Sequence, residues 1–134
     1  ANAPWGRLLD KSRFFGCCGC FGNVARLRRD FGICKGEVLK DYMDNLVARK
    51  VGHKGYTLKN LHDEKGVVLR LGACNVTTRR FELLDYLSHP NMPVATAARA
   101  SSSVPVVFVP VQYRTKAGLD MLYVDGGLEG NIPT

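Results

Sequence analysis

The chain has 134 residues and a formal net charge of +7, from 19 Lys and Arg residues against 12 Asp and Glu. Its composition, 46% hydrophobic and 23% charged, is near the average for globular domains and excludes intrinsic disorder, collagen-like repeats and a disulfide-dense mini-scaffold. The longest apolar run, residues 104–111, contains two prolines and is far shorter than the roughly 18 to 20 residues of a membrane-spanning helix.

The first 30 residues are the most basic part of the chain. They carry a net charge of +4, whereas the remaining 104 residues carry +3. Such a segment attracts phosphate-bearing partners, either nucleic acid or the anionic headgroups of a membrane. An ordinary solvated surface gives the same pattern, so the charge alone leaves both interpretations open.

A cysteine cluster lies in this basic segment, at Cys17, Cys18 and Cys20. Structural zinc sites usually pair two separate Cys-x2–4-Cys or His-x3–5-His units, and no histidine of the chain has a second ligand at that spacing. An odd total of five cysteines, with no recognisable secretory signal, favours reduced thiols in a cytosolic setting. Acylation of the cluster is the second interpretation and a metal site is the third.

The middle of the chain predicts two helices. Residues 35–50 place apolar side chains at helical spacing, which predicts an amphipathic helix whose apolar stripe faces a core. Gly52 and Gly55 are expected to end it. Thr57 is expected to cap a short helix over residues 58–61, because its hydroxyl can accept a hydrogen bond from an unpaired backbone N–H.

The second half of the chain predicts strands separated by a helix. Residues 67–76 are nearly continuously apolar and predict a strand buried on both faces, closed by a turn at 77–79; residues 80–87 predict a neighbouring strand or a loop. Residues 94–100 predict a closely packed helix, 104–111 an edge strand or shaped loop, and 121–124 a final strand. This alternation predicts an α/β architecture with a mainly parallel sheet.

The candidate chemistry lies where the final strand ends, at Asp125, Gly126 and Gly127. Open α/β sheets form their ligand crevices at the carboxyl ends of strands, so a carboxylate at this point is a candidate functional group. The two glycines permit positive backbone dihedral angles and the close approach of another group. Taken alone, Asp-Gly-Gly is also an ordinary turn that ends a strand.

The surrounding motifs are more specific. Residues 97–111 read Ala-Ala-Arg-Ala-Ser-Ser-Ser-Val-Pro-Val-Val-Phe-Val-Pro-Val, residues 123–128 read Tyr-Val-Asp-Gly-Gly-Leu, and residues 131–133 read Asn-Ile-Pro. In this order they resemble the C-terminal part of the patatin-like phospholipase domain. Gly36 with the helix after it, and segments 56–58, 69–78 and 93–94, are similar to that family in the same order. The resemblance covers residues 30–134 and leaves 1–29 as a basic, variable segment rich in Cys and Gly.

The resemblance implies a serine lipid acyl hydrolase with a Ser-Asp dyad, on a three-layer patatin-like fold with a mainly parallel sheet that is incomplete here. Asp125 takes the role of general base, and no cofactor or metal is implied. The family's nucleophile lies in a Gly-x-Ser-x-Gly elbow, which does not occur in this chain, and neither does the family's glycine-rich oxyanion loop. We therefore expect the 134-residue chain alone to be inactive.

Other polar residues are expected to have structural roles. Three successive serines, Ser101, Ser102 and Ser103, lack the glycines of a nucleophile elbow and are expected to form a helix-to-loop junction. A Ser-Asp dyad needs no histidine, so the three histidines of the chain are expected at the surface or in loops. The histidines are His53, His62 and His89.

Three functional hypotheses follow. The first is a fragment of an active patatin-like hydrolase that cleaves ester bonds of phospholipids or neutral lipids, and both chain ends fit a fragment. The second is a non-catalytic relative that binds lipid or a protein partner. The third, a nucleic-acid-binding module, has only the +7 charge in its favour and no recognition motif, so no nucleic acid is expected. We expect a cytoplasmic location, with peripheral membrane association as the alternative.

Overall fold

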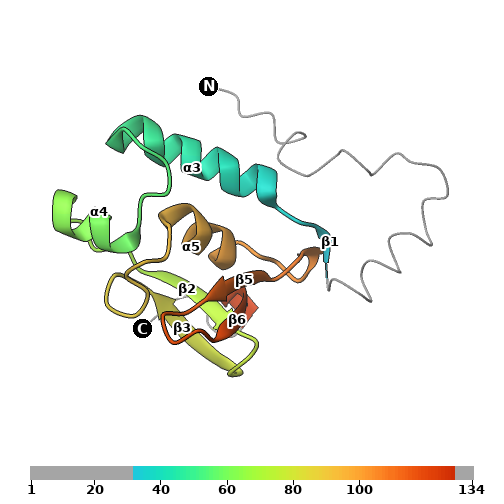
Figure 1. Cartoon of the computed structure of the whole chain (residues 1–134). Coiled ribbons are helices and arrows are strands. Elements are labelled where there is room, and N and C mark those ends of the chain that lie inside the picture. The colour runs from blue at the N-terminus through green and yellow to red at the C-terminus, as the bar shows by residue number, and fades with distance from the viewer. Residues whose placement is uncertain (1–31, 129–134) are drawn as a thin grey trace, which may run out of the picture.

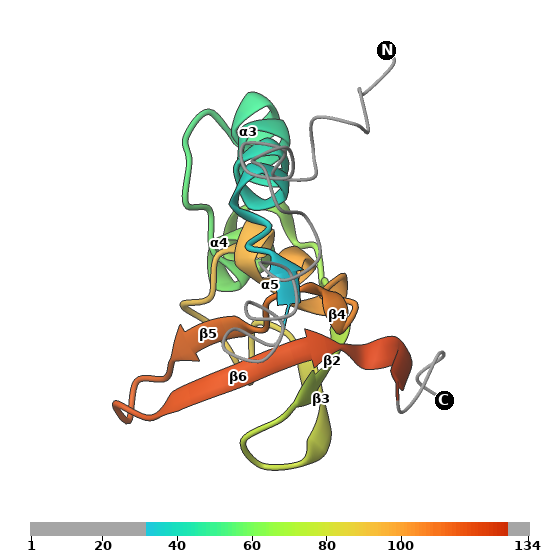
Figure 2. The same cartoon turned by 90° about the vertical axis from the view of Figure 1, so that its right-hand side faces the viewer.

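The structure is a computed structural model and describes residues 32–128. The basic segment 1–29, the cluster of Cys17, Cys18 and Cys20, and the Asn-Ile-Pro motif lie outside the described residues. Figure 1 shows the order of the elements, and Figure 2 shows that α5 (Val94–Ser101) lies between the main sheet and α3 (Glu37–Val51).

The residues predicted to end α3 and to begin α4 do so in the structure. Gly52 ends α3 with a φ of 95°, and its N–H donates to the carbonyl of Ala48 at 2.7 Å. Thr57 precedes α4 (Leu58–Lys65), and its Oγ1 accepts a hydrogen bond from the N–H of Asn60 at 3.1 Å. The cap at Thr57 is therefore confirmed, although α4 extends beyond the predicted residues 58–61.

The predicted burial of the α3 stripe is wrong. Val38, Tyr42 and Leu46, one helical turn apart, are 37–43% exposed, and no residue of α3 is buried. Among the described residues, α5 is the element that α3 packs against, and α5 lies between α3 and the main sheet (Figure 2). The spacing predicted the helix correctly, but burial depends on a neighbouring element that spacing does not specify.

Four strands form the main sheet, in the order β3-β2-β6-β5. They are β2 (Leu71–Asn75), β3 (Arg80–Leu84), β5 (Val111–Arg114) and β6 (Asp120–Asp125), and all neighbours are antiparallel. A second, two-stranded sheet pairs β1 (Gly32–Cys34) with β4 (Val106–Phe108) in parallel.

The α/β class is confirmed, but the mainly parallel sheet is not. Within residues 32–128 the only parallel pair is β1–β4. The tight turn at residues 76–79 joins β2 to β3, and a short turn before Asp120 joins β5 to β6. Such short connections join only antiparallel strands, because a parallel pair needs a crossover of about a dozen residues or more. Val67 and Val68, predicted within a buried strand, precede β2 and are half exposed.

The core lies between α5 and the main sheet. Ala97 and Ala100 of α5 are fully buried against Ala73 of β2 and Tyr123 of β6, together with Leu84 of β3. Small side chains on α5 allow its backbone to approach the sheet closely, as the sequence predicts for this helix. The core thus connects α5 directly to the strand that ends at Asp125.

Candidate active site

Asp125 is the last residue of β6, an inner strand of the sheet. Tyr123 and Val124 before it are buried, whereas the Asp125 side chain is half-buried. The 3-10 turn η2 (Gly126–Leu128) follows at once. The structure therefore places the carboxylate at the carboxyl end of a core strand, as the sequence predicts.

Gly126 lies against the backbone of the neighbouring strand. A Cβ atom at this position would lie 2.6 Å from the carbonyl carbon of Gly72 and 2.7 Å from its oxygen. Real Cβ atoms do not approach backbone this closely, so any other residue would push η2 away from β2. Close packing, and not a positive φ, is the reason for glycine here.

Two backbone groups hold Asp125 in place. The N–H of Gly127 donates to Asp125 Oδ1 at 2.9 Å, which closes a turn over the carboxylate. The N–H of Asp125 itself donates to the carbonyl of Ser103 at 2.9 Å. The candidate aspartate is therefore linked to the end of α5 as well as to its own turn.

The three serines form the helix-to-loop junction that the sequence predicts. Ser102 Oγ donates to the carbonyl of Ala98 at 2.9 Å, and Ser103 Oγ donates to that of Arg99 at 2.7 Å. Ser103 is fully buried, and Ser101 and Ser102 are half-buried at the end of α5. These two hydroxyls are thus engaged with backbone carbonyls one turn earlier, a common arrangement of helical serines.

Arg99 is a residue of this site that sequence reasoning missed. It is 2% exposed, and its guanidinium donates to Ser103 Oγ, to the carbonyl of Lys35 at 2.9 Å and to that of Val109 at 3.0 Å. The centroid of the Phe108 ring lies 4.5 Å from its Cζ, in cation–π geometry. One signal was present in the sequence: Arg99 lies in a helix of small residues that is expected to pack closely. An arginine buried in such a helix needs hydrogen-bonding partners, because arginine is almost never fully buried without them.

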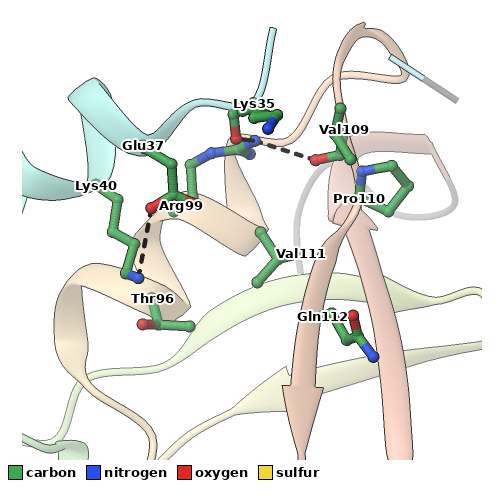
Figure 3. A pocket seen from close by; sticks show the side chains of 9 residues that line it. All are labelled: Lys35, Glu37, Lys40, Thr96, Arg99, Val109, Pro110, Val111 and Gln112. Carbon is green, nitrogen blue, oxygen red and sulfur yellow. Dashed lines mark hydrogen bonds and ion pairs between the residues drawn. The ribbon is translucent and has the colours of Figure 1, made fainter. Parts of the chain in front are cut away.

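A pocket of about 520 Å³ adjoins Arg99. Figure 3 shows its walls, which come from Lys35 and the start of α3, from α5, and from residues 109–112, the last two of which begin β5. They are Lys35, Glu37, Lys40, Thr96, Arg99, Val109, Pro110, Val111 and Gln112. Asp125 does not line this pocket, so the pocket is not the space in front of the candidate carboxylate.

The three histidines lie at the surface or in loops, as predicted, but His89, in the loop between β3 and α5, is largely covered. His53 is exposed, and His62 is partly exposed on α4, stacked on Tyr86. The side chain of His89 is only 10% exposed, and its Nε2 lies 2.9 Å from the Tyr123 hydroxyl. Burial lowers the pKa of His89, although the nearby carboxylates of Glu82 and Asp85 act in the opposite direction.

Neither a metal cluster nor a membrane-spanning helix is found among residues 32–128. That part of the chain contains no group of three or more His, Cys, Asp or Glu residues placed to hold a metal ion. Likewise, none of its helices combines the length and the apolar character needed to cross a membrane.

Comparison with known proteins decides the family. Residues 9–134 match the patatin-like phospholipase family. The chain belongs to this family. The family resemblance of the motifs is thus confirmed. The matched region begins at residue 9, within the basic segment, and not at residue 30.

Two curated relatives match this chain. The probable lipid hydrolase 463L of Invertebrate iridescent virus 6 is 24% identical over 106 residues, which cover 79% of this chain and 35% of the relative. The uncharacterized protein YqhO of Bacillus subtilis is 31% identical over 108 residues, 76% of this chain and 35% of the relative. The chain thus spans about a third of the length of these relatives. No solved structure matches it.

Proposed function

We propose that the protein carrying this chain is a lipid acyl hydrolase in which Asp125 is the general base of a Ser-Asp dyad. The observation that carries the proposal is the Asp-Gly-Gly turn at the end of β6, in a member of the patatin-like family. The name of the viral relative, a probable lipid hydrolase, supports the substrate class.

The proposed role of Asp125 is to accept the proton of a serine hydroxyl. A serine hydroxyl becomes an effective nucleophile when a neighbouring group accepts its proton. In the proposed reaction the serine oxygen attacks the ester carbonyl carbon while its proton passes to Asp125. The tetrahedral intermediate then expels the alcohol, which takes that proton, and water hydrolyses the acyl-enzyme by the same route. No step requires a metal or an organic cofactor.

The serine elbow and the oxyanion loop must come from sequence other than these 134 residues, which contain no Gly-x-Ser-x-Gly. The chain by itself is therefore proposed to be inactive. The mainly parallel, three-layer sheet remains our proposal for the complete domain, with the β1–β4 pair as its described parallel part. The basic segment is proposed to meet anionic lipid headgroups at a membrane surface, in the cytoplasm.

The experiment uses the natural gene product that contains this chain, assayed on p-nitrophenyl esters and on phospholipid vesicles. Asp125→Asn is expected to lower turnover by about 100-fold or more, because general base catalysis typically contributes that much. Asp120→Asn, at the exposed opposite end of the same strand, is the matched control and is expected to keep activity. Circular dichroism checks that both variants fold.

The main alternative is a non-catalytic relative that binds lipid or a protein partner, and the absence of the elbow from this chain favours it. A gene product without Gly-x-Ser-x-Gly, or one whose hydrolysis is unaffected by Asp125→Asn, supports this alternative and contradicts the dyad.

A further inference from the structure

The N–H of Asp125 is held from outside the main sheet. On that side of β6 the neighbour is β5, whose first residue, Val111, lies opposite Tyr123. The pairing of β5 therefore ends two residues before Asp125. Beyond the end of β5, the carbonyl of Ser103 accepts the hydrogen bond from the Asp125 N–H, at 2.9 Å. The position of the strand end thus depends on where Ser103 is placed.

Ser103 is in turn fixed by Arg99, one helical turn earlier. The Ser103 hydroxyl donates to the Arg99 carbonyl at 2.7 Å and accepts from the Arg99 guanidinium, so both of its hydrogen-bonding roles go to one residue. Ser103 is fully buried and Arg99 is 2% exposed, which keeps competing water away from both bonds.

The guanidinium of Arg99 is anchored by two segments distant in the sequence. Nη2 donates to the carbonyl of Lys35, just before α3, and to that of Val109, just after β4 (Figure 3). Gly36 has a φ of 71°, and a Cβ atom there would overlap the guanidinium. The backbone at Lys35, Gly36 and Val109 therefore packs directly against the Arg99 side chain.

We propose that Arg99 and Ser103 are positioning residues for Asp125. They connect the ends of the parallel β1–β4 pair to the candidate base, through the Ser103 carbonyl. This proposal rests on the proposed function, in which Asp125 accepts a proton from a serine. Misplacing a reacting group by about 1 Å can lower a rate by about 100-fold, so a loose connection reduces turnover without removing the base.

The chemistry of the contacts specifies arginine and not merely a positive charge. A planar guanidinium with five N–H donors reaches the two carbonyls and the hydroxyl together, whereas a lysine ammonium is a compact point charge on a flexible stem. Arg99→Lys keeps the charge and is expected to lose the set of hydrogen bonds to Ser103, Lys35 and Val109. Ser103→Ala removes the hydroxyl alone and is expected to loosen the Ser103 carbonyl, which accepts the Asp125 N–H.

The test measures kcat and KM separately in the natural gene product, with a soluble p-nitrophenyl ester. Arg99→Lys and Ser103→Ala are each expected to lower kcat by about tenfold or more and to change KM by less than about twofold. Ser102→Ala is the matched control, because its hydroxyl also donates one turn back, to the carbonyls of Ala98 at 2.9 Å and Arg99 at 3.3 Å, whereas it is the Ser103 hydroxyl that accepts from the Arg99 guanidinium. It is expected to keep kcat within about twofold.

A second measurement separates positioning from general destabilisation. Hydrogen exchange of the Asp125 amide is expected to accelerate in Arg99→Lys and Ser103→Ala and to stay slow in Ser102→Ala. Leu58→Ala, a core change far from Asp125 in the sequence, destabilises the fold and is expected to leave kcat of the folded enzyme unchanged.

Two outcomes overturn the positioning role: wild-type kcat in Arg99→Lys, or equal losses of kcat in Ser102→Ala and Ser103→Ala. The proposed function is overturned instead if the wild-type protein hydrolyses no ester, or if its hydrolysis does not depend on Asp125. In that case hydrogen exchange of the Asp125 amide still tests whether Arg99 and Ser103 hold Asp125 in place. Unchanged exchange in both Arg99→Lys and Ser103→Ala contradicts that role.

Discussion

Individual residues at the end of β6 are specified by space as much as by chemistry. Asp125 needs a following residue without a side chain, because η2 packs directly on the backbone of β2 at Gly72. The Asp-Gly-Gly sequence therefore combines a functional candidate with a packing requirement. This explains why the same three residues are compatible with both a turn and a site when only the sequence is considered.

Gly126→Ala is predicted to destabilise the protein by about 1–3 kcal/mol, the usual cost of forcing extra volume into a packed site. The new methyl group would meet the Gly72 carbonyl at 2.6–2.7 Å and shift η2. Urea unfolding followed by circular dichroism measures the change in the free energy of unfolding. Gly127→Ala, at the exposed next position, keeps its N–H to Asp125 and is the control. Equal losses in the two variants would contradict the packing argument.

The sequence located Asp125 at a strand end and the serines in a junction, because both are local patterns. It did not identify Arg99, whose partners lie 64 residues before it at Lys35 and 10 residues after it at Val109. An arginine among small helical residues signals burial, but the carbonyls that it bonds to are distant in the sequence. Local spacing within α5 predicts close packing, which is correct, but contains no information about what the guanidinium contacts.

At the scale of elements, the same division between local and distant signals holds. The ends of α3 and α4 follow from Gly52 and Thr57, whose effects are confined to one helical turn. Strand direction is different, because apolar character predicts that residues 71–75 are extended and says nothing about their partners. Short turns account for the antiparallel β2–β3 and β5–β6 pairs. The antiparallel β2–β6 pair joins segments about fifty residues apart, and the parallel β1–β4 pair joins segments more than seventy residues apart.

A polar cluster joins three of these elements inside the fold. Glu82 of β3 accepts hydrogen bonds from the Tyr123 hydroxyl of β6 at 3.1 Å and from Asn75 Nδ2 of β2 at 2.9 Å. His89, in the segment before α5, contacts the same hydroxyl and packs edge-on against Tyr113. Burial raises the pKa of Tyr123, with the Glu82 charge adding to the effect, so its hydroxyl stays a donor at neutral pH.

The cluster predicts a loss of stability in mild acid. Because burial lowers the pKa of His89 in the folded state, the folded protein binds a proton less readily than the unfolded chain. The contribution of neutral His89 is therefore present above the usual histidine pKa of about 6.5, and it is lost as the pH falls through the lower folded-state pKa. The pKa of Asp85 is itself lowered: burial opposes this, but hydrogen bonds from Ser88 and Leu87 and the Arg70 charge outweigh it.

Urea midpoints at about pH 7 and about pH 5, on either side of the usual histidine pKa, test this prediction. The wild type is expected to lose more stability over this interval than His89→Gln, which keeps a neutral hydrogen-bonding group at the Tyr123 hydroxyl. Asp85 is common to both proteins and loses its contribution only at lower pH, below the usual carboxyl range. Parallel pH dependence in the two proteins would show that protonation of His89 is not coupled to folding.

At the scale of the whole molecule, residues 32–128 leave considerable apolar surface uncovered. Leu122 on β6 is 39% exposed, Val107 on β4 is 41% exposed, and Val76 after β2 is 48% exposed. Strands β3 and β5 are the outer strands of the four-stranded sheet, and unpaired outer strands invite association with other chains. The helices α3 and α5 lie on one face of this sheet (Figure 2), and Leu122 belongs to the alternate set of β6 residues from the buried Tyr123.

The 134-residue chain alone is therefore predicted to self-associate, with a molar mass that rises with concentration in size-exclusion chromatography with light scattering. Leu122→Lys adds a charge at an exposed apolar position without touching the core between α5 and the sheet, and it is expected to reduce that association. A monomer tolerates this substitution because the long charged side chain can extend into water. Soluble, monomeric wild-type chain that unfolds cooperatively would instead mean that the exposed sheet face is stable in water, and that these residues form an autonomous unit of the patatin-like domain.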